Sequence, residues 1–125
     1  MKKFLLGLFA TCCAVGCSAE NREGFTSVDA GAFARAIEAE GVQLIDARTP
    51  AEFAQGHIPG AVNIDVNGSG WDAQIEKLDK SRPVAVYCRS GRRSKIAAER
   101  LVKQGFEKIT ELDEGFLSWN GDVEK

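Results

Sequence analysis

The residues best suited to chemistry lie in one short stretch, from Tyr87 to Ser94. Here a cysteine, Cys88, is followed by three arginines, a glycine and two serines, in the order Arg89-Ser90-Gly91-Arg92-Arg93-Ser94. Nearby cationic side chains favour the thiolate over the thiol, and the thiolate is the nucleophilic form of cysteine. A free cysteine is more often a small buried hydrophobe, but three flanking arginines favour a reactive one. The stretch therefore predicts an ionised, nucleophilic Cys88 beside groups that attract an anion.

The elements on either side of this stretch place Cys88 at a corner between a strand and a helix. The apolar run 83–87 has strand character and ends at Cys88, and a helical run, 94–102, begins just after the arginines. In parallel α/β sheets such corners lie at the carboxyl ends of strands, where ligands bind. Backbone N–H groups of the loop and of the first helical turn then point toward the ligand. Gly91 supplies a position for positive φ, and Ser94 is expected to cap the helix.

The rest of the chain alternates between strand and helix patterns. Short stretches with strand character occupy 25–28, 42–45, 61–64, 84–87 and 108–112. Helical spacing, capping residues and glycine stops predict helices over 30–39, 50–53, 71–78 and 94–104. This alternation predicts an α/β fold with about five mostly parallel strands and helices on both faces. A chain of 125 residues has room for one such domain, which we place at 25–125.

Composition and charge exclude several classes of protein. The apolar fraction is 44%, which is typical of a globular protein and argues against disorder. The net charge is −2 at pH 7, so no general surface for polyanions is indicated and nucleic acid is not expected as a partner. The chain has one histidine and, past its amino terminus, one cysteine, which cannot build a zinc site. We expect neither a metal ion nor an organic cofactor.

The amino terminus has the pattern of an export signal. Two lysines precede an apolar run, 4–16, that has the size of a secretory signal and is short for a membrane span. We therefore expect a signal peptide over 1–16. Because Cys12 and Cys13 would leave with this signal, the four cysteines of the chain do not indicate a disulfide framework.

The end of this segment predicts how the domain is held in place. Ala14-Val15-Gly16-Cys17 resembles a bacterial lipobox, in which cleavage precedes a lipid-modified cysteine, although Ala14 stands where Leu or Val is usual. We expect lipid attachment at Cys17, a polar tether over 17–24, and a location on the periplasmic side of a bacterial membrane. The alternative is a plain signal peptide that leaves a soluble periplasmic protein.

Three blocks of the sequence carry a resemblance to a known family. The first runs from Leu44 to Ile64 and includes Asp46-Ala47-Arg48 and Gly56-His57-Ile58-Pro59-Gly60. The second is the stretch from Tyr87 to Ser94. The third runs from Leu112 to Trp119, although the family commonly has a glycine pair where Glu114-Gly115 stands. Together the blocks resemble the rhodanese-like single-domain sulfurtransferases, over almost the whole of the expected domain.

The resemblance implies an enzyme that works through a persulfide. Cys88 would take the outer sulfur from a donor such as thiosulfate, release sulfite, and pass the sulfur to cyanide or to a thiol, either a protein or a small molecule. The loop residues Arg89, Ser90, Gly91, Arg92, Arg93 and Ser94 would bind the sulfur-containing anion. Arg48 matches a family position that touches substrate. For Arg48, a salt bridge with Asp46 or Glu52 is the alternative.

Other functions for the same cysteine stay open. A domain that carries persulfide or senses oxidants at the membrane, without turnover, would need the same thiolate. Tyrosine phosphatases and arsenate reductases also hold an oxyanion over a cysteine, but they have an arginine six positions after it. Here Ser94 occupies that position and Arg93 comes one place early, so the tighter loop favours a single sulfur over a phosphate.

Overall fold

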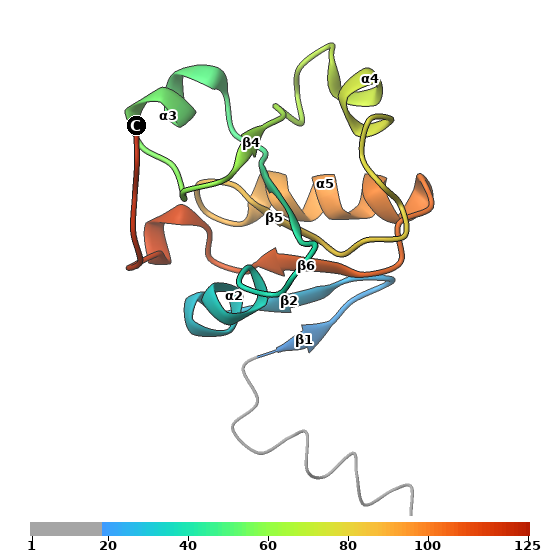
Figure 1. Ribbon diagram of the computed structural model, residues 1–125, viewed down its shortest axis with the longest axis horizontal. Helices are drawn as coiled ribbons and strands as arrows, with labels where there is room; N and C mark the ends of the chain where they lie inside the picture. The colour runs from blue at the N-terminus through green and yellow to red at the C-terminus, as the bar shows by residue number, and fades with distance from the viewer. Residues whose placement is uncertain (1–18) are drawn as a thin grey trace, which may run out of the picture.

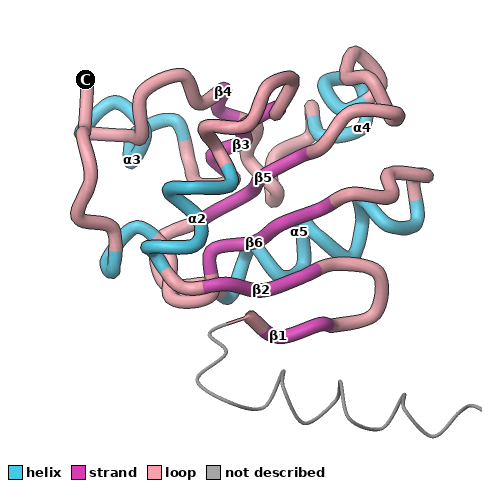
Figure 2. Tube along the Cα trace, turned by 60° about the horizontal axis from the view of Figure 1, so that its bottom comes forward, coloured by secondary structure: helices cyan, strands magenta, loops and turns pink. Residues whose placement is uncertain are grey.

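The computed structural model describes residues 19–125. The expected signal peptide, 1–16, and the expected lipid site, Cys17, lie outside these residues. Six strands form one sheet in the order β1-β2-β6-β5-β3-β4, which can be followed in Figure 2. The strands are β1 (Glu20–Asn21), β2 (Thr26–Val28), β3 (Gln43–Asp46), β4 (Val62–Asn63), β5 (Val84–Tyr87) and β6 (Ile109–Leu112). All neighbours are parallel except β1 and β2.

Helices cover both faces of this sheet, so the predicted α/β architecture is confirmed (Figure 1). They are α2 (Ala30–Ala36), α3 (Pro50–Gln55), α4 (Trp71–Ile75) and α5 (Arg92–Lys103), followed by a 3-10 turn, η1 (Phe116–Ser118). Two helices end earlier than expected. The sequence predicted that α2 reaches residue 39 and that α4 reaches residue 78. In both cases single turns replace the last helical residues, with bonds such as Ala39 N–H to Ala36 O and Leu78 N–H to Ile75 O.

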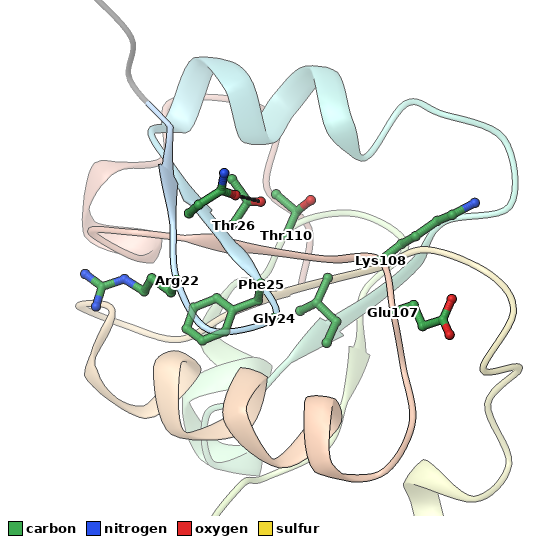
Figure 3. A pocket seen from close by; sticks show the side chains of 9 residues that line it. Arg22, Gly24, Phe25, Thr26, Glu107, Lys108 and Thr110 are labelled. Carbon is green, nitrogen blue, oxygen red and sulfur yellow. Dashed lines mark hydrogen bonds between the residues drawn. The ribbon is translucent and has the colours of Figure 1, made fainter. Parts of the chain in front are cut away.

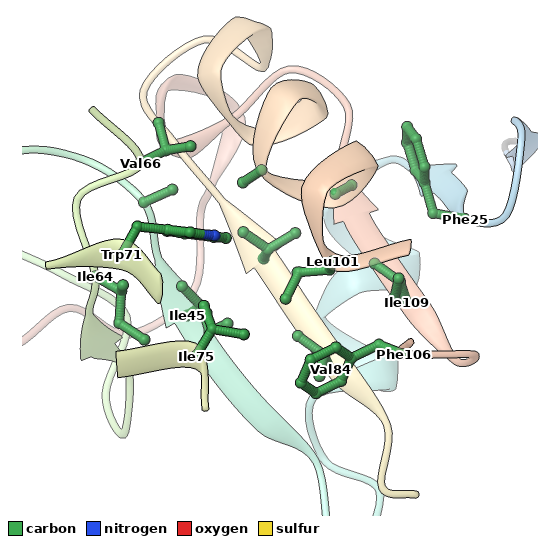
Figure 4. Packing of buried hydrophobic residues seen from close by; sticks show 14 residues of the cluster. Phe25, Ile45, Ile64, Val66, Trp71, Ile75, Val84, Leu101, Phe106 and Ile109 are labelled. Carbon is green, nitrogen blue, oxygen red and sulfur yellow. The ribbon is translucent and has the colours of Figure 1, made fainter. Parts of the chain in front are cut away.

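The central strand β5 separates two hydrophobic clusters because its side chains alternate between the faces. Val84 and Val86 belong to the cluster beneath α4 and α5 (Figure 4). Ala85 and Tyr87 belong to the cluster on the α2 side. All four side chains are buried, as expected for a central strand of a parallel sheet covered on both faces. The strand is therefore a fixed base for Cys88, which follows it directly.

The first strand lies within the segment that the sequence suggested as a tether, 17–24. Glu20 and Asn21 pair in antiparallel register with Ser27 and Thr26 of β2. This sixth strand was not predicted, because its two residues are polar. Among residues 19–125, no helix combines the length and the apolar character needed to cross a membrane.

The last residues return to the body of the domain. Glu124 and His57 exchange two backbone hydrogen bonds of 2.9 Å, and the His57 ring stacks on Phe53 with 3.6 Å between ring centres. His57 Nδ1 lies 2.9 Å from the Phe53 carbonyl oxygen. His57 therefore connects α3 to the carboxyl-terminal residues of the domain.

Candidate active site

Cys88 stands at the corner that the sequence predicted, between the carboxyl end of β5 and the start of α5. Gly91 is the residue before the helix and has a φ of 98°, which glycine adopts without strain. This conformation turns the Gly91 N–H inward, where it donates a hydrogen bond to Cys88 Sγ at 3.1 Å. One amide of the loop is thus aimed at the sulfur.

The sulfur itself lies inside the protein. Cys88 has an exposed fraction of 0%, whereas its neighbours Arg89 and Ser90 are exposed. The second close partner of the sulfur is Ser94 Oγ, at 3.4 Å. Contact between a substrate and this sulfur therefore requires groups around it to move.

Ser94 has a different role from the expected one. The helix begins at Arg92, Gly91 is its N-cap, and no side chain caps it. The prediction that Ser94 caps the helix is wrong because the helix starts two residues earlier. The Ser94 hydroxyl instead points into the core, where it donates to Glu111 Oε2 at 2.5 Å.

The three arginines of the loop do not gather around the sulfur. Arg89 and Arg92 are exposed, while Arg93 forms two hydrogen bonds to Glu52 of α3, at 2.8 and 3.1 Å. The hydrogen bond from Arg93 lowers the pKa of Glu52 to about 2, helped by bonds from the Thr49 amide and hydroxyl. The same pair raises the pKa of Arg93, to which the charge of Cys88 also contributes. Arg93 is therefore held in place by its ion pair with Glu52.

The turn after β6 is hydrogen-bonded to the loop that contains Cys88. Phe116 N–H donates to the Cys88 carbonyl at 2.8 Å, and Leu117 N–H donates to the Arg89 carbonyl at 3.0 Å. The fit leaves no room for side chains at two glycines: a Cβ on Gly91 would overlap the Asp113 carbonyl, and one on Gly115 would overlap the Arg89 backbone. Residues 112–119, the third block of the resemblance, thus hold the loop of the second block, 87–94, in place.

Arg48 is buried against a carboxylate and an aromatic ring. Its guanidinium donates to both oxygens of Asp46, the shortest distance being 2.7 Å, and to the Gly56 carbonyl at 2.7 Å. The Phe116 ring centre lies 4.4 Å from its Cζ. The salt bridge with Asp46 therefore forms, while the predicted contact between Arg48 and substrate stays a prediction. Arg48 does line a hollow of about 230 Å³ together with Arg89 and Leu117.

Sequence reasoning missed the polar residues beneath the loop. Glu111 lies in β6 with an exposed fraction of 0%, and it accepts hydrogen bonds from Ser94 and Ser27. Lys95 Nζ lies 3.3 Å from the same carboxylate and 2.9 Å from Asp113. A signal was available, because Glu111 lies on the same strand face as Ile109, two residues away, where a glutamate is unusual unless it has a buried partner.

Two further features of residues 19–125 bear on other kinds of site. No group of three or more His, Cys, Asp or Glu side chains is placed to hold a metal ion in this part of the chain. A larger hollow, of about 520 Å³, lies at the opposite edge of the sheet, at the amino ends of β2 and β6. Figure 3 shows Arg22, Glu107 and Lys108 around it. Cys88 is not among the residues that line it.

Several known proteins resemble this chain. The model of the rhodanese-like domain matches residues 29–122. The chain belongs to this family. A thiosulfate sulfurtransferase, GlpE of Shewanella oneidensis, is 40% identical over 83 residues, which cover 66% of this chain and 80% of GlpE. A sulfurtransferase of Allochromatium vinosum is 39% identical over 85 residues, covering 68% of this chain and 78% of the relative.

Two other relatives extend this picture of the family. The Bacillus subtilis protein YrkF, named provisionally as a sulfur carrier protein, is 31% identical over 108 residues. These residues cover 86% of this chain and 57% of YrkF, so the chain spans little more than half of that relative. Among solved structures, a rhodanese-related protein from Thermoplasma volcanium is 28% identical with a TM-score of 0.68, over 78% of this chain and 96% of the relative.

Proposed function

We propose that this rhodanese-like domain is a sulfurtransferase in which Cys88 carries the sulfur as a persulfide. The observation that carries the proposal is the position of Cys88, at a strand end with the Gly91 amide directed at its sulfur. Relatives named thiosulfate sulfurtransferase support thiosulfate as a donor. We propose cyanide or a thiol as the acceptor, since either nucleophile attacks sulfane sulfur.

The transfer consists of two displacements. In the first, the Cys88 sulfur attacks the outer sulfur of thiosulfate, a new S–S bond forms, and the bond to sulfite breaks with its electron pair on sulfite. In the second, the acceptor attacks the outer sulfur of the persulfide and Cys88 leaves with the electron pair. The loop residues Arg89, Ser90, Gly91, Arg92, Arg93 and Ser94 are proposed to bind the donor. We expect the exposed Arg89 and Arg92 to stabilise the growing charge on sulfite, because Arg93 is paired with Glu52.

The proposal is tested by turnover. The protein is expected to form thiocyanate from thiosulfate and cyanide over many cycles, with kinetics that depend on both substrates in a ping-pong pattern. Cys88→Ser is expected to abolish the activity while circular dichroism and the unfolding midpoint stay close to those of the wild type. Thiocyanate production that survives in Cys88→Ser would refute the role of this residue.

A carrier without turnover is the second candidate, and the similarity to YrkF favours it. Such a protein would load one sulfur on Cys88 and release it only to a specific protein thiol. Intact-mass analysis after incubation with thiosulfate separates the two. Loading of one sulfur atom without thiocyanate formation supports the carrier, whereas multiple turnovers support the enzyme.

The location of the protein is a separate proposal that rests on the sequence. We propose that Cys17 carries a lipid on the periplasmic side of a bacterial membrane and that 1–16 is removed. A soluble periplasmic protein, cleaved near the same point, is the alternative. Intact-mass analysis of the membrane-extracted protein distinguishes them, because lipid attachment at Cys17 adds the mass of its acyl chains.

A further inference from the structure

Lys95 lies near the start of α5, close to the loop that holds Cys88, and the sulfur transfer described above gives it no role. Its side chain is 23% exposed, so neighbouring groups cover most of it. Lys95 Nζ lies 3.0 Å from the Asp113 carbonyl oxygen, 2.9 Å from Asp113 Oδ1, 3.3 Å from Glu111 Oε2 and 3.2 Å from the Gly91 carbonyl oxygen. One ammonium group thus joins three segments of the site, which are the loop, β6 and the turn after β6.

These contacts occupy the ammonium group of Lys95 fully. An ammonium has three hydrogens to donate, and four oxygens lie within hydrogen-bond distance of this one. A positive charge near the amino end of a helix is unfavourable by itself, because the helix dipole is positive there. The carboxylates of Glu111 and Asp113 compensate this charge, and the hydrogen bond from Lys95 lowers the pKa of Asp113. Lys95 is therefore engaged within the site and has no hydrogen left for a substrate.

The contact with the Gly91 carbonyl bears on the amide that is aimed at the sulfur. The Gly91 N–H donates to Cys88 Sγ at 3.1 Å. Glycine has wide conformational freedom, so the direction of this amide depends on what holds the residue. Lys95 binds the carbonyl of Gly91 and also the Asp113 carbonyl, against which the Gly91 Cα packs so closely that a Cβ would overlap it. The ammonium thus fixes Gly91 and the surface on which it rests.

The same contact constrains an amide at the start of the helix. The Gly91 carbonyl and the Arg92 N–H belong to one planar trans peptide group, so they point in opposite directions. Arg92 is the first residue of α5, and an N–H at this position has no carbonyl partner within the helix. Amides of this kind attract anions. Lys95 therefore constrains two consecutive amides of the loop, and the first of them is directed at the Cys88 sulfur.

We propose that Lys95 is a positioning residue for sulfur transfer, which keeps the Gly91 amide directed at the Cys88 sulfur. It does so by holding two carbonyls, those of Gly91 and Asp113. The inference rests on the proposed sulfur transfer, which it refines. Charge moves between the Cys88 sulfur and sulfite during the transfer, and an N–H donor that is already in place stabilises such charge without reorganisation. Loss of Lys95 leaves this donor present but no longer fixed.

The first test measures thiocyanate formation from thiosulfate and cyanide by the full chain. Lys95→Met removes the ammonium, and we expect kcat/KM for thiosulfate to fall about tenfold because the amide is misaligned. Lys95→Arg can still donate to several oxygens and is expected to recover to within about threefold of the wild type. Lys103→Met removes the same charge from the exposed far end of α5 and is expected to leave the rate unchanged. A fully active Lys95→Met, or a Lys95→Arg as impaired as Lys95→Met, would overturn the inference.

A second background separates positioning from neutralisation of Glu111. Glu111 is buried completely, so Lys95→Met also removes a cation beside a buried carboxylate and destabilises the fold. Glu111→Gln removes that negative charge, so the comparison in this background covers the case in which Lys95→Met alone does not fold. We expect Lys95→Met to lower kcat/KM about tenfold in the Glu111→Gln background as well. Equal activity of the double variant and Glu111→Gln would show that Lys95 acts only through the charge of Glu111, and the inference would be wrong.

Hydrogen exchange provides a readout that needs no sulfur donor. Exchange of the Gly91 amide is followed by nuclear magnetic resonance in the wild type and in Lys95→Met, and we expect it to be about tenfold faster in the variant. Exchange of the Val86 amide in β5 is expected to stay the same, because the core strand is unchanged. Unchanged exchange at Gly91, or equal acceleration at Val86, would refute a positioning role. Failure of thiocyanate formation in the wild type refutes the proposed transfer instead, so the two failures are distinguishable.

Discussion

Two buried polar clusters lie at the same edge of the sheet and are built in opposite ways. The Asp46 cluster (Asp46, Arg48 and Tyr87) pairs two opposite charges directly, and Tyr87 donates to Asp46 at 2.7 Å. The Cys88 cluster (Cys88, Ser94 and Glu111) places a neutral hydroxyl between a carboxylate and a sulfur. Both clusters lie at or next to the carboxyl ends of β3, β5 and β6, which are neighbours in the sheet.

The difference shows how one sheet edge supports both stability and reactivity. In the Asp46 cluster, charge-assisted hydrogen bonds fix each group in one state. Burial raises the pKa of Tyr87 far above its ordinary value of 10, and the charge of Asp46 acts in the same direction, so the hydroxyl remains a donor. In the Cys88 cluster, the hydroxyl of Ser94 donates to Glu111 and lies 3.4 Å from the Cys88 sulfur. The Asp46 cluster therefore fixes the strand ends by charge pairing, whereas the Cys88 cluster holds the nucleophile through a neutral hydroxyl.

The largest expected effect comes from breaking the charge pair of the Asp46 cluster. Arg48→Met leaves Asp46 as a buried carboxylate without its cation, which costs about 3–5 kcal/mol of unfolding free energy. Urea unfolding of the chain measures this loss. The matched variant is Arg93→Met, whose ion pair with Glu52 is partly exposed and is worth at most about 1 kcal/mol. Equal losses in the two variants would contradict the expected difference between a buried ion pair and a partly exposed one.

An intermediate effect is expected from removing one hydroxyl of the Asp46 cluster. In the native protein, Tyr87 Oη also accepts a hydrogen bond from the Ile58 amide at 3.0 Å. Tyr87→Phe therefore leaves a buried carboxylate oxygen and a buried N–H without this partner, at a cost of about 1–3 kcal/mol. Thermal or urea unfolding gives the value. A variant as stable as the wild type would show that water or a shifted backbone replaces the hydroxyl.

The smallest expected effect concerns pH and the loop arginine. The pKa of Glu52 is lowered from 4.5 to about 2 in the folded protein, so its contribution to stability is present above about pH 4.5 and is lost as the pH falls toward 2. Because the Glu52 side chain is 28% exposed, we expect a contribution below about 1 kcal/mol. It is measured as the difference in unfolding free energy between wild type and Glu52→Gln across this range.

The sequence was sufficient for the fold and for the place of the nucleophile. Alternating apolar runs predicted the five parallel strands, because periodicity and turn residues are local signals. The strand β1 was not predicted, since two polar residues at a sheet edge have no apolar pattern. Its pairing depends on the position of β2, which only the assembled sheet defines.

The surroundings of the nucleophile were less predictable. Sequence proximity suggested that three arginines act on Cys88, but the direction of each side chain depends on where α5 begins. Starting the helix at Arg92 rather than Ser94 turned Ser94 inward and left Arg92 exposed. Glu111 is 23 residues away along the chain from Cys88, and parallel pairing of β5 with β6 brings its strand alongside. Such a contact is a property of the topology.

The interlocked turns at Gly91 and Gly115 also bear on protein engineering. Each glycine lies against the backbone of the other segment, and two amides of the second turn bind carbonyls of the first. A transplant of residues 88–94 into another scaffold would therefore lose its shape unless residues 113–117 were moved with it. The two peptides therefore have to be transferred together, although a helix and a strand separate them along the chain.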